Sequence, residues 1–129
     1  MSRITALVDT SVLVDLSRGD TRSQAWSLAQ KDNLLGLHVV VSMELAEGAR
    51  DKDELERVNR MLSRYDLVYL TPPDCVWAVE QHRVFHLSHG VGLLDALIAS
   101  SAVRLNIPIY THNLRHFEPL PDVLAVRPY

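Results

Sequence analysis

The sequence is poor in cysteine and contains no long apolar run. Its only cysteine is Cys75, so no internal disulfide can form, and we expect a reducing compartment, namely the cytoplasm. Cys75 itself is interpreted as a small buried apolar residue. No run approaches the roughly 18 apolar residues of a membrane span. The apolar stretch that begins at Ile4 is interrupted by Asp9 and Asp15, which is not typical of a signal peptide.

Positive charge is also scarce. The chain has 13 lysines and arginines against 16 aspartates and glutamates, a formal net charge of −3. A domain that holds nucleic acid mainly by charge is usually basic. Any nucleic-acid role must therefore be local and metal-assisted, or depend on a partner or a second subunit. The arginines at 50, 57, 60 and 64 have two interpretations, a phosphate-binding row or an ordinary charged helix face.

What the sequence does contain is typical of a globular chain. Apolar residues make up 47% and charged residues 22%, and the length of 129 residues suits one compact domain, 1–129. Short β-rich runs alternate with helical periods, which predicts parallel strands joined by right-handed crossovers. The expected fold is a three-layer α/β/α sandwich with a mainly parallel central sheet. The pattern predicts strands at 4–8, 37–41, 67–70, 107–110 and 123–126, and helices at 11–17, 23–31, 43–49 (capped by Ser42), 53–65, 72–89 (capped by Thr71) and 93–105.

Three acidic residues stand where such a fold places its site, beyond the carboxyl ends of the strands. Asp9 ends the first strand in ALVDTS, Glu44 begins a helix in VVVSMELAEGA, and Asp95 lies in the first turn of a helix in GLLDALIAS. An acid between Leu94 and Ala96 on a buried helix is costly unless it is paired or metal-bound. Each acid alone can also be read as an ordinary residue of a helix N-terminus. Together, three carboxylates without lysine partners favour a divalent cation that prefers oxygen ligands.

Four motifs carry a family resemblance: VDTSVLVDL at 8–16, VSMELAEGA at 41–49, LLDALIAS at 93–100 and YTHNLRHFEPL at 110–120. Because the motifs occur in the order and at the spacing of that family, the chain resembles PIN-domain proteins, specifically VapC-type toxins of bacterial and archaeal toxin–antitoxin pairs. The resemblance covers nearly the whole chain. It implies a metal-dependent endoribonuclease that hydrolyses RNA with Mg²⁺ or Mn²⁺, forms a homodimer and is inhibited by a cognate antitoxin protein.

The family's site residues fall on named positions of this chain. Its three acidic metal ligands, which are also its catalytic residues, fall on Asp9, Glu44 and Asp95. Many members carry a fourth acid where this chain has the neutral Asn113, so the presence of a second metal ion stays open. The resemblance further implies supporting polar side chains, at Ser11, Thr111 and Asn113.

Other residues leave alternatives open. His112 and His116 have a spacing that can bind zinc on a helix, but surface or packing roles are expected for them and for the histidines at 82, 86 and 89. Asp15 is interpreted as solvated, and Trp26 as a core or interface residue. The alternative function is a PIN-like module that binds RNA or a partner without cutting, which Asn113 and the acidic net charge favour.

The inhibitor that the resemblance implies needs a docking surface. We expect it in a groove between the early helices and the helix at 53–65, where a short antitoxin helix would lay its apolar face. An arginine from the antitoxin would then reach Asp9 and Glu44 and block the metal. The apolar lining is expected from Leu16, Trp26, Leu28, Leu55 and Met61.

Overall fold

The computed structural model describes residues 3–30 and 34–129, and within them it contains five strands, six α-helices and one 3-10 helix. The predicted strand 4–8 and helix 93–105 have the predicted bounds, whereas the end of helix 23–31 at Lys31 lies outside the described residues. In chain order the elements are β1 (Ile4–Val8), α1 (Thr10–Ser17), α2 (Thr21–Ala29), β2 (Leu34–His38), α3 (Val39–Glu47), α4 (Lys52–Leu62), β3 (Asp66–Val68), α5 (Pro72–His89), α6 (Leu93–Leu105), β4 (Ile109–Tyr110), η1 (Leu114–His116) and β5 (Ala125–Val126).

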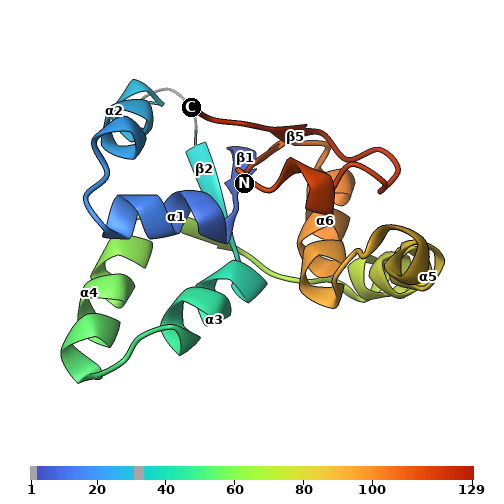
Figure 1. Ribbon diagram of the computed structural model, residues 1–129, viewed down its shortest axis with the longest axis horizontal. Coiled ribbons are helices and arrows are strands. Elements are labelled where there is room, and N and C mark those ends of the chain that lie inside the picture. The colour runs from blue at the N-terminus through green and yellow to red at the C-terminus, as the bar shows by residue number, and fades with distance from the viewer. Residues whose placement is uncertain (1–2, 31–33) are drawn as a thin grey trace.

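The strands form one parallel sheet in the order β3-β2-β1-β4-β5. Helices α1, α2 and α4 lie to one side of β1 and β2, and α5 and α6 lie to the other side (Figure 1). This arrangement confirms the predicted three-layer sandwich. The chain runs outward from β1 to β3 and then returns to β4, so its direction across the sheet reverses between β1 and β4. In parallel α/β sheets the crevice at such a reversal is where ligands bind.

The core surrounds the central strand. Leu7 and Val8 of β1 are buried, because a strand in the middle of a sandwich is covered on both faces. Ile98 and Ala99 of α6 are also buried and belong to the same hydrophobic cluster. Burial of this set holds β1 and α6 in fixed positions, and both elements lead directly to acidic residues at their ends.

The predicted strand at 37–41 is wrong in its second half. The strand ends at His38, and Val39 already begins α3, so Ser42 does not cap that helix. Instead, the His38 side chain caps it, because Nδ1 accepts a hydrogen bond from the backbone N–H of Val40 at 3.1 Å. The β-branched run tolerates the helical turn because Val40 and Val41 bury their side chains in the core.

The His38 ring is completely buried in a chain of hydrogen bonds. Its Nε2 lies 3.0 Å from Ser101 Oγ, and that hydroxyl donates to Asp74 Oδ2 at 2.9 Å. Asp74 in turn accepts from Arg104 Nε at 2.9 Å. The network ties the start of α3 to α5 and α6, because Asp74 also forms a capping box with Thr71, the residue predicted to cap α5.

Helix α5 begins and ends as the sequence indicates. Pro72 stands in its first turn, and Gly90 ends it with a φ of 67°, a left-handed conformation that glycine adopts without strain. Cys75 lies on its surface and is exposed, so the interpretation of this residue as buried is wrong. In the described part of the chain, no helix has both the length and the apolar character that crossing a membrane requires.

Candidate active site

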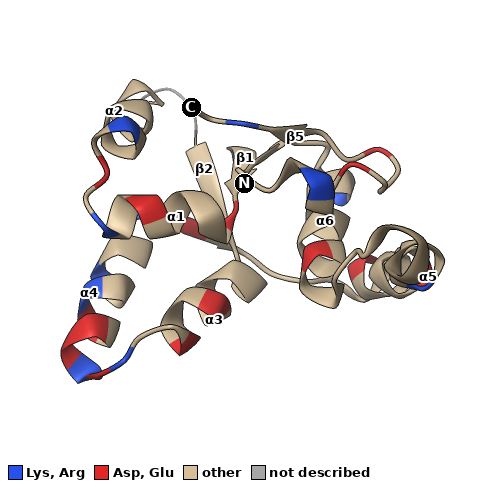
Figure 2. Ribbon diagram, viewed as in Figure 1, with Lys and Arg blue, Asp and Glu red and all other residues tan. Residues whose placement is uncertain are grey.

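Three separate elements bring acidic side chains to one cleft. Asp9 follows β1, Glu44 lies on α3 and Asp95 lies on α6, and all three line a cleft of about 420 Å³. In Figure 2 a red segment follows β1, and further red segments lie on α3 and α6. The cleft stands at the carboxyl end of β1, beside the reversal between β1 and β4. The topology therefore brings together residues that are far apart in the sequence.

Asp9 is buried and held by a neighbouring strand. Its Oδ2 accepts a hydrogen bond from Thr111 Oγ1 at 2.7 Å, and its backbone N–H donates to Tyr110 O at 2.9 Å. Asp9 is the N-cap residue of α1 by backbone conformation, but its side chain makes no capping hydrogen bond. Asp9 thus occupies the N-cap position, but its carboxylate does not serve as the cap and lines the cleft instead.

Glu44 lies beyond the first turn of α3, so the simple reading of it as a helix N-terminal residue is wrong. Thr10 Oγ1 donates a hydrogen bond to Glu44 Oε1 at 3.2 Å. Burial raises the pKa of Glu44, and the negative charges of Asp9 and Glu47 add to the rise while the Thr10 hydroxyl opposes it. The sequence reasoning missed Thr10, although its position directly after Asp9 was a signal.

Asp95 lies in the first turn of α6 with 22% of its side chain exposed. Burial, together with the negative charges of Asp9 and Glu44, raises its pKa to about 6 against the opposing effect of the nearby His116. His116 Nδ1 lies 3.2 Å from Asp95 Oδ2. His116 is exposed, which agrees with the predicted surface role, and it also lines the cleft. Leu94 beside Asp95 is exposed, so the expected fully buried setting is only partly present.

Thr111 organises the polar floor behind the cleft. It is fully buried, donates to Asp9, accepts the backbone N–H of Asn113 at 2.9 Å and lies 3.5 Å from Ser11 Oγ. Ser11 Oγ accepts the backbone N–H of His112 at 3.1 Å. Ser11 and Asn113 line the cleft itself. The structure thus brings the three predicted acids and the three predicted supporting residues to one place.

The donor set suits a hard divalent cation. Three carboxylates face the cleft, and none of the described residues that line it is a lysine or an arginine. Within residues 3–30 and 34–129, no group of three or more histidine, cysteine, aspartate or glutamate side chains is placed so that it could hold a metal ion directly. Magnesium usually keeps several waters and takes only one or two carboxylates directly. Asp9, Glu44 and Asp95 are the cleft residues that would hold such an ion, in part through its waters.

His112 does not share the cleft with His116, so the two histidines form no common zinc site. Its Nε2 lies 3.4 Å from Asp15 Oδ2, and its ring packs against Tyr129 at a centroid distance of 4.6 Å. The Tyr129 hydroxyl donates to Asp15 Oδ2 at 2.6 Å, so the interpretation of Asp15 as merely solvated is wrong. Trp26 packs on Tyr129 and is buried, which confirms a core role.

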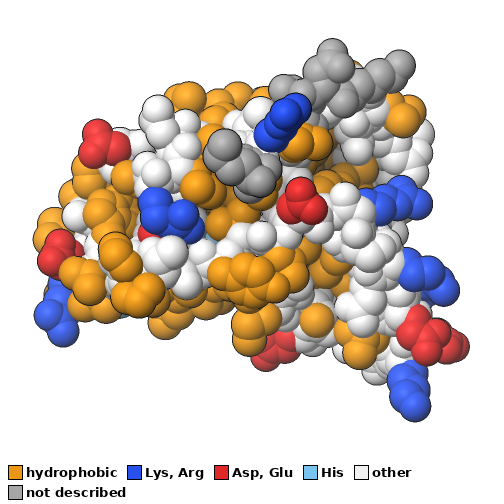
Figure 3. Space-filling view, turned by 180° about the vertical axis from the view of Figure 1, so that it is seen from behind, with side chains coloured by type: hydrophobic (Ala, Val, Ile, Leu, Met, Phe, Trp, Pro, Cys, Tyr) orange, Lys and Arg blue, Asp and Glu red, His pale blue; other side chains and the backbone are white. Residues whose placement is uncertain are grey.

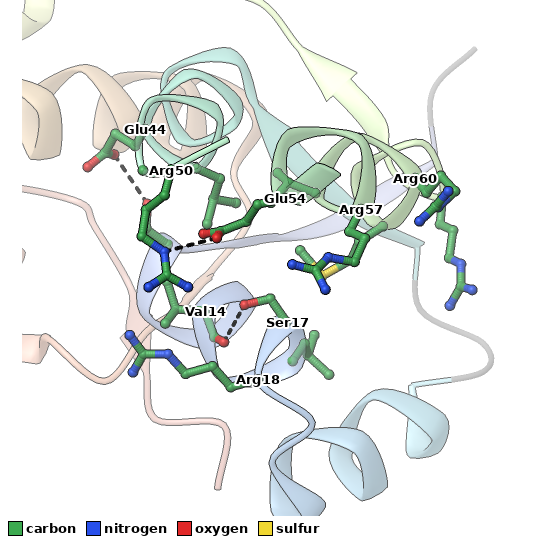
Figure 4. A pocket seen from close by; sticks show the side chains of 15 residues that line it. Val14, Ser17, Arg18, Glu44, Arg50, Glu54, Arg57 and Arg60 are labelled. Carbon is green, nitrogen blue, oxygen red and sulfur yellow. Dashed lines mark hydrogen bonds and ion pairs between the residues drawn. The ribbon is translucent and has the colours of Figure 1, made fainter. Parts of the chain in front are cut away.

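A second, larger hollow of about 950 Å³ lies between α1, α3 and α4 and shares Thr10 and Glu44 with the acidic cleft (Figure 4). We call it the arginine groove. Of the apolar lining predicted for this place, Leu16 and Met61 are present, but Trp26 is in the core and Leu28 is 72% exposed on α2. Leu55 is not among the lining residues. The groove is named for five basic side chains that line it: Arg18, Arg50, Arg57, Arg60 and Arg64.

The sequence is similar to a known protein family and to two proteins named as ribonucleases. A family model described as "PIN domain" matches residues 6–120. The chain is 34% identical over 113 residues to "Ribonuclease VapC10" of Mycobacterium tuberculosis (strain ATCC 25618 / H37Rv), covering 86% of this chain and 84% of that protein. It is 29% identical over 125 residues to "Ribonuclease VapC" of Rickettsia bellii (strain RML369-C), covering 91% of each.

Solved structures have the same fold. A toxin–antitoxin complex from Klebsiella pneumoniae contains a chain with a TM-score of 0.79 and 23% identity, with coverage of 97% of this chain and 98% of that one. VapBC-1 from nontypeable Haemophilus influenzae contains one with a TM-score of 0.80 and 20% identity, at the same coverage. At this identity the likeness establishes the fold alone.

Proposed function

The chain belongs to the PIN-domain family, and from this membership we propose that it is a divalent-metal-dependent endoribonuclease of the VapC type, which hydrolyses phosphodiester bonds of RNA. The observation that carries the proposal is the convergence of Asp9, Glu44 and Asp95 on one cleft. The relatives named as ribonucleases support the choice of RNA as substrate.

We assign the metal-binding role to the same three carboxylates and take Mg²⁺ or Mn²⁺ as the ion. When bound, such an ion polarises the scissile phosphate and lowers the pKa of a water. The protein's part is to keep the carboxylate oxygens in place. Thr111 fixes Asp9, Thr10 fixes Glu44 and His116 lies against Asp95. Rigid placement of this kind lowers the reorganisation that the reaction requires.

Asn113 lines the cleft where many members carry a further acid. Its side-chain amide is neutral and ligates more weakly than a carboxylate, so the residues present support one metal ion more strongly than two. The same feature favours the alternative of a PIN-like module that binds RNA or a partner without cutting it. A cleavage assay separates the two functions.

The test compares the wild-type chain, Asp9→Asn and a matched control, Glu80→Gln, which removes one exposed acid on α5. Labelled RNA is incubated with each protein in Mg²⁺, in Mn²⁺ and in EDTA. Wild type and Glu80→Gln should cut only with metal, and Asp9→Asn should not cut. Cleavage by well-folded Asp9→Asn, or full cleavage in EDTA, contradicts the proposal.

A second measurement reads metal binding without activity. An ion that binds only the folded state at 100 times its Kd stabilises that state by about 2.7 kcal/mol. Mg²⁺ or Mn²⁺ should therefore raise the melting temperature of wild type and Glu80→Gln. The same ions should leave the melting temperature of Asp9→Asn nearly unchanged. An equal rise in all three proteins places the ion elsewhere.

We further propose that a dedicated antitoxin protein inhibits the chain, since the solved neighbours include a toxin–antitoxin complex from Klebsiella pneumoniae. The arginine groove ends at Glu44, so a segment lying in it can reach the acidic cleft. Co-expression with the product of the adjacent reading frame tests this. Growth arrest that the adjacent gene does not relieve, or the lack of a stable complex, contradicts this partner but leaves the nuclease proposal standing.

A further inference from the structure

We propose that the arginine groove binds the phosphates of the RNA strand on one side of the scissile bond. The inference rests on the proposed function, because it deepens the account of the substrate. It also resolves the two interpretations of the arginines at 50, 57, 60 and 64. These residues do not spread over an ordinary charged helix face but line one hollow together with Arg18 from the end of α1.

Charge in the groove is opposite to charge on the whole chain. The described residues that line it include five arginines and two glutamates, a formal charge of +3, whereas the chain as a whole carries −3. The groove therefore holds five of the chain's 13 basic residues. A concave surface with one sign of charge raises the local concentration of the opposite charge. The ligand that this surface favours is a polyanion.

Among the residues that the structure describes, most of this charge has no ion-pair partner. Arg50 pairs with Glu54 at 3.0 Å and is 86% exposed. In the part of the chain that the structure describes, no carboxylate forms an ion pair with any of the other four arginines of the groove. Figure 4 shows Arg50 and Arg57 on the α4 side and Arg18 beside Val14 and Ser17 on α1. Planar guanidinium groups on facing walls can each bind phosphate through two hydrogen bonds.

The groove leads to the candidate active site. Thr10 and Glu44 line both hollows, so a strand whose scissile phosphate lies in the acidic cleft can continue between α1 and α4. This solves a physical problem of the site. A cleft of three carboxylates repels RNA at close range, and the arginines next to it compensate for that repulsion.

RNA and the proposed antitoxin would compete for this groove. Its apolar lining comes from Val14, Leu16, Leu45, Val58 and Met61, of which Leu45 is buried and the others are partly buried against the core. An apolar helix would leave the arginines uncovered or desolvated without partners, which is costly. RNA supplies an acceptor for each of them. An acidic peptide of a partner protein is thus a distinct outcome of the test.

The experiment measures RNA binding, not cleavage. The full chain carrying Asp9→Asn binds a fluorescein-labelled, unstructured 20-nucleotide RNA in EDTA, and anisotropy is recorded at several salt concentrations. Two double variants are compared in this background: Arg57→Gln with Arg60→Gln in the groove, and Arg83→Gln with Arg127→Gln, exposed residues elsewhere. Both pairs remove the same charge. Circular dichroism verifies folding, and a gel verifies that the RNA stays intact.

We expect the groove pair to weaken binding by roughly tenfold and the control pair to change it by less than about twofold. The slope of log K against log salt should fall by about 1.4 for the groove pair, since each lost phosphate contact removes about 0.7. Equal effects of both pairs, or unchanged affinity of the groove pair, overturn the proposal. If the groove pair keeps its RNA affinity but no longer binds a co-expressed partner protein, the RNA proposal is overturned, and an acidic peptide of that partner is the ligand of the groove. RNA cut by Asp9→Asn instead contradicts the proposed function, a result that the gel separates from the binding data.

Discussion

Thr111 Oγ1 lies 2.7 Å from Asp9 Oδ2, and this hydrogen bond joins the carboxyl ends of two adjacent parallel strands. Both residues are buried. The bond orients one carboxylate of the cleft through a residue 102 positions later in the chain. We therefore predict that Thr111 acts as a positioning residue.

Thr111→Val keeps the side-chain shape but removes the hydroxyl. It leaves the buried Asp9 carboxylate without this donor, so we expect a loss of about 1–3 kcal/mol in the free energy of unfolding. RNA cleavage in Mg²⁺ should fall at least roughly tenfold. Urea denaturation and a cleavage assay measure the two effects. Thr111→Ser keeps the hydroxyl and should restore cleavage, and its failure to do so would argue for a role of the methyl group.

Asp95 should destabilise the metal-free protein at neutral pH. Its pKa is raised from 3.8 to about 6, so the folded state holds this proton more tightly than the unfolded state. The contribution of the protonated Asp95 carboxyl to the free energy of unfolding is complete below about pH 4 and is lost as pH rises through 6. Asp95→Asn should therefore raise the free energy of unfolding at pH 7 in EDTA, by the order of 1 kcal/mol after allowance for its exposure. It should also abolish cleavage.

Urea midpoints at pH 4 and pH 7 measure this effect, with Glu80→Gln as the control that changes an exposed acid. The gain for Asp95→Asn should be present at pH 7 and nearly vanish at pH 4. A variant less stable than wild type at pH 7 would show that the contact with His116 outweighs the repulsion within the cleft.

His38 should make folding sensitive to acid. Burial lowers its pKa from 6.5 to about 4, with Arg104 adding to the decrease and Asp74 opposing it. Between these two pKa values, His38 is protonated in the unfolded chain and neutral in the folded chain. The free energy of unfolding should be at its full value above pH 6.5 and fall as pH decreases toward 4. Protonation at Nδ1 would also break the cap of α3, which carries Glu44.

Urea denaturation between pH 4 and pH 8 measures this slope. His38→Asn should flatten the curve at a lower overall stability, because the bond to Ser101 is lost. His89→Gln changes an exposed histidine and should leave the slope as in wild type. If His38→Asn keeps the wild-type slope, the acid sensitivity comes from other groups.

The apolar surface of α5 should take part in a homodimer. Val76, Val79 and Val84 are exposed on this helix and Leu87 is 93% exposed, and hydrophobic side chains cover much of the left half of the reverse view (Figure 3). Exposed apolar patches of this kind mark interfaces. Sedimentation equilibrium should show a dimer for wild type and a shift to monomer for Leu87→Glu. Leu124→Glu, which changes an exposed leucine near β5, is the control, and a shift in both variants or in neither contradicts this interface.

Much of the fold followed from local patterns in the sequence. The apolar face of 93–105 and the signals at Thr71, Pro72 and Gly90 predicted α5 and α6 well, because caps and periodicity act within a few residues. The alternation of strands and helices predicted a parallel sheet. That topology in turn placed Asp9, Glu44 and Asp95 at one edge, since the carboxyl ends of parallel strands face the same way.

Tertiary contacts decided the rest. Val39, Val40 and Val41 have strand propensity, yet they begin α3 because a buried His38, held by Ser101 from α6, caps the helix there. The contact of His116 with Asp95 joins side chains from separate segments and leaves no local signal. The spacing of the arginines on α4 is the same whether the helix face is simply solvated or forms the wall of a groove, so the sequence alone does not distinguish the two. Only the packing of α1 against α3, with α4 alongside, turned that row of charge into the wall of a hollow.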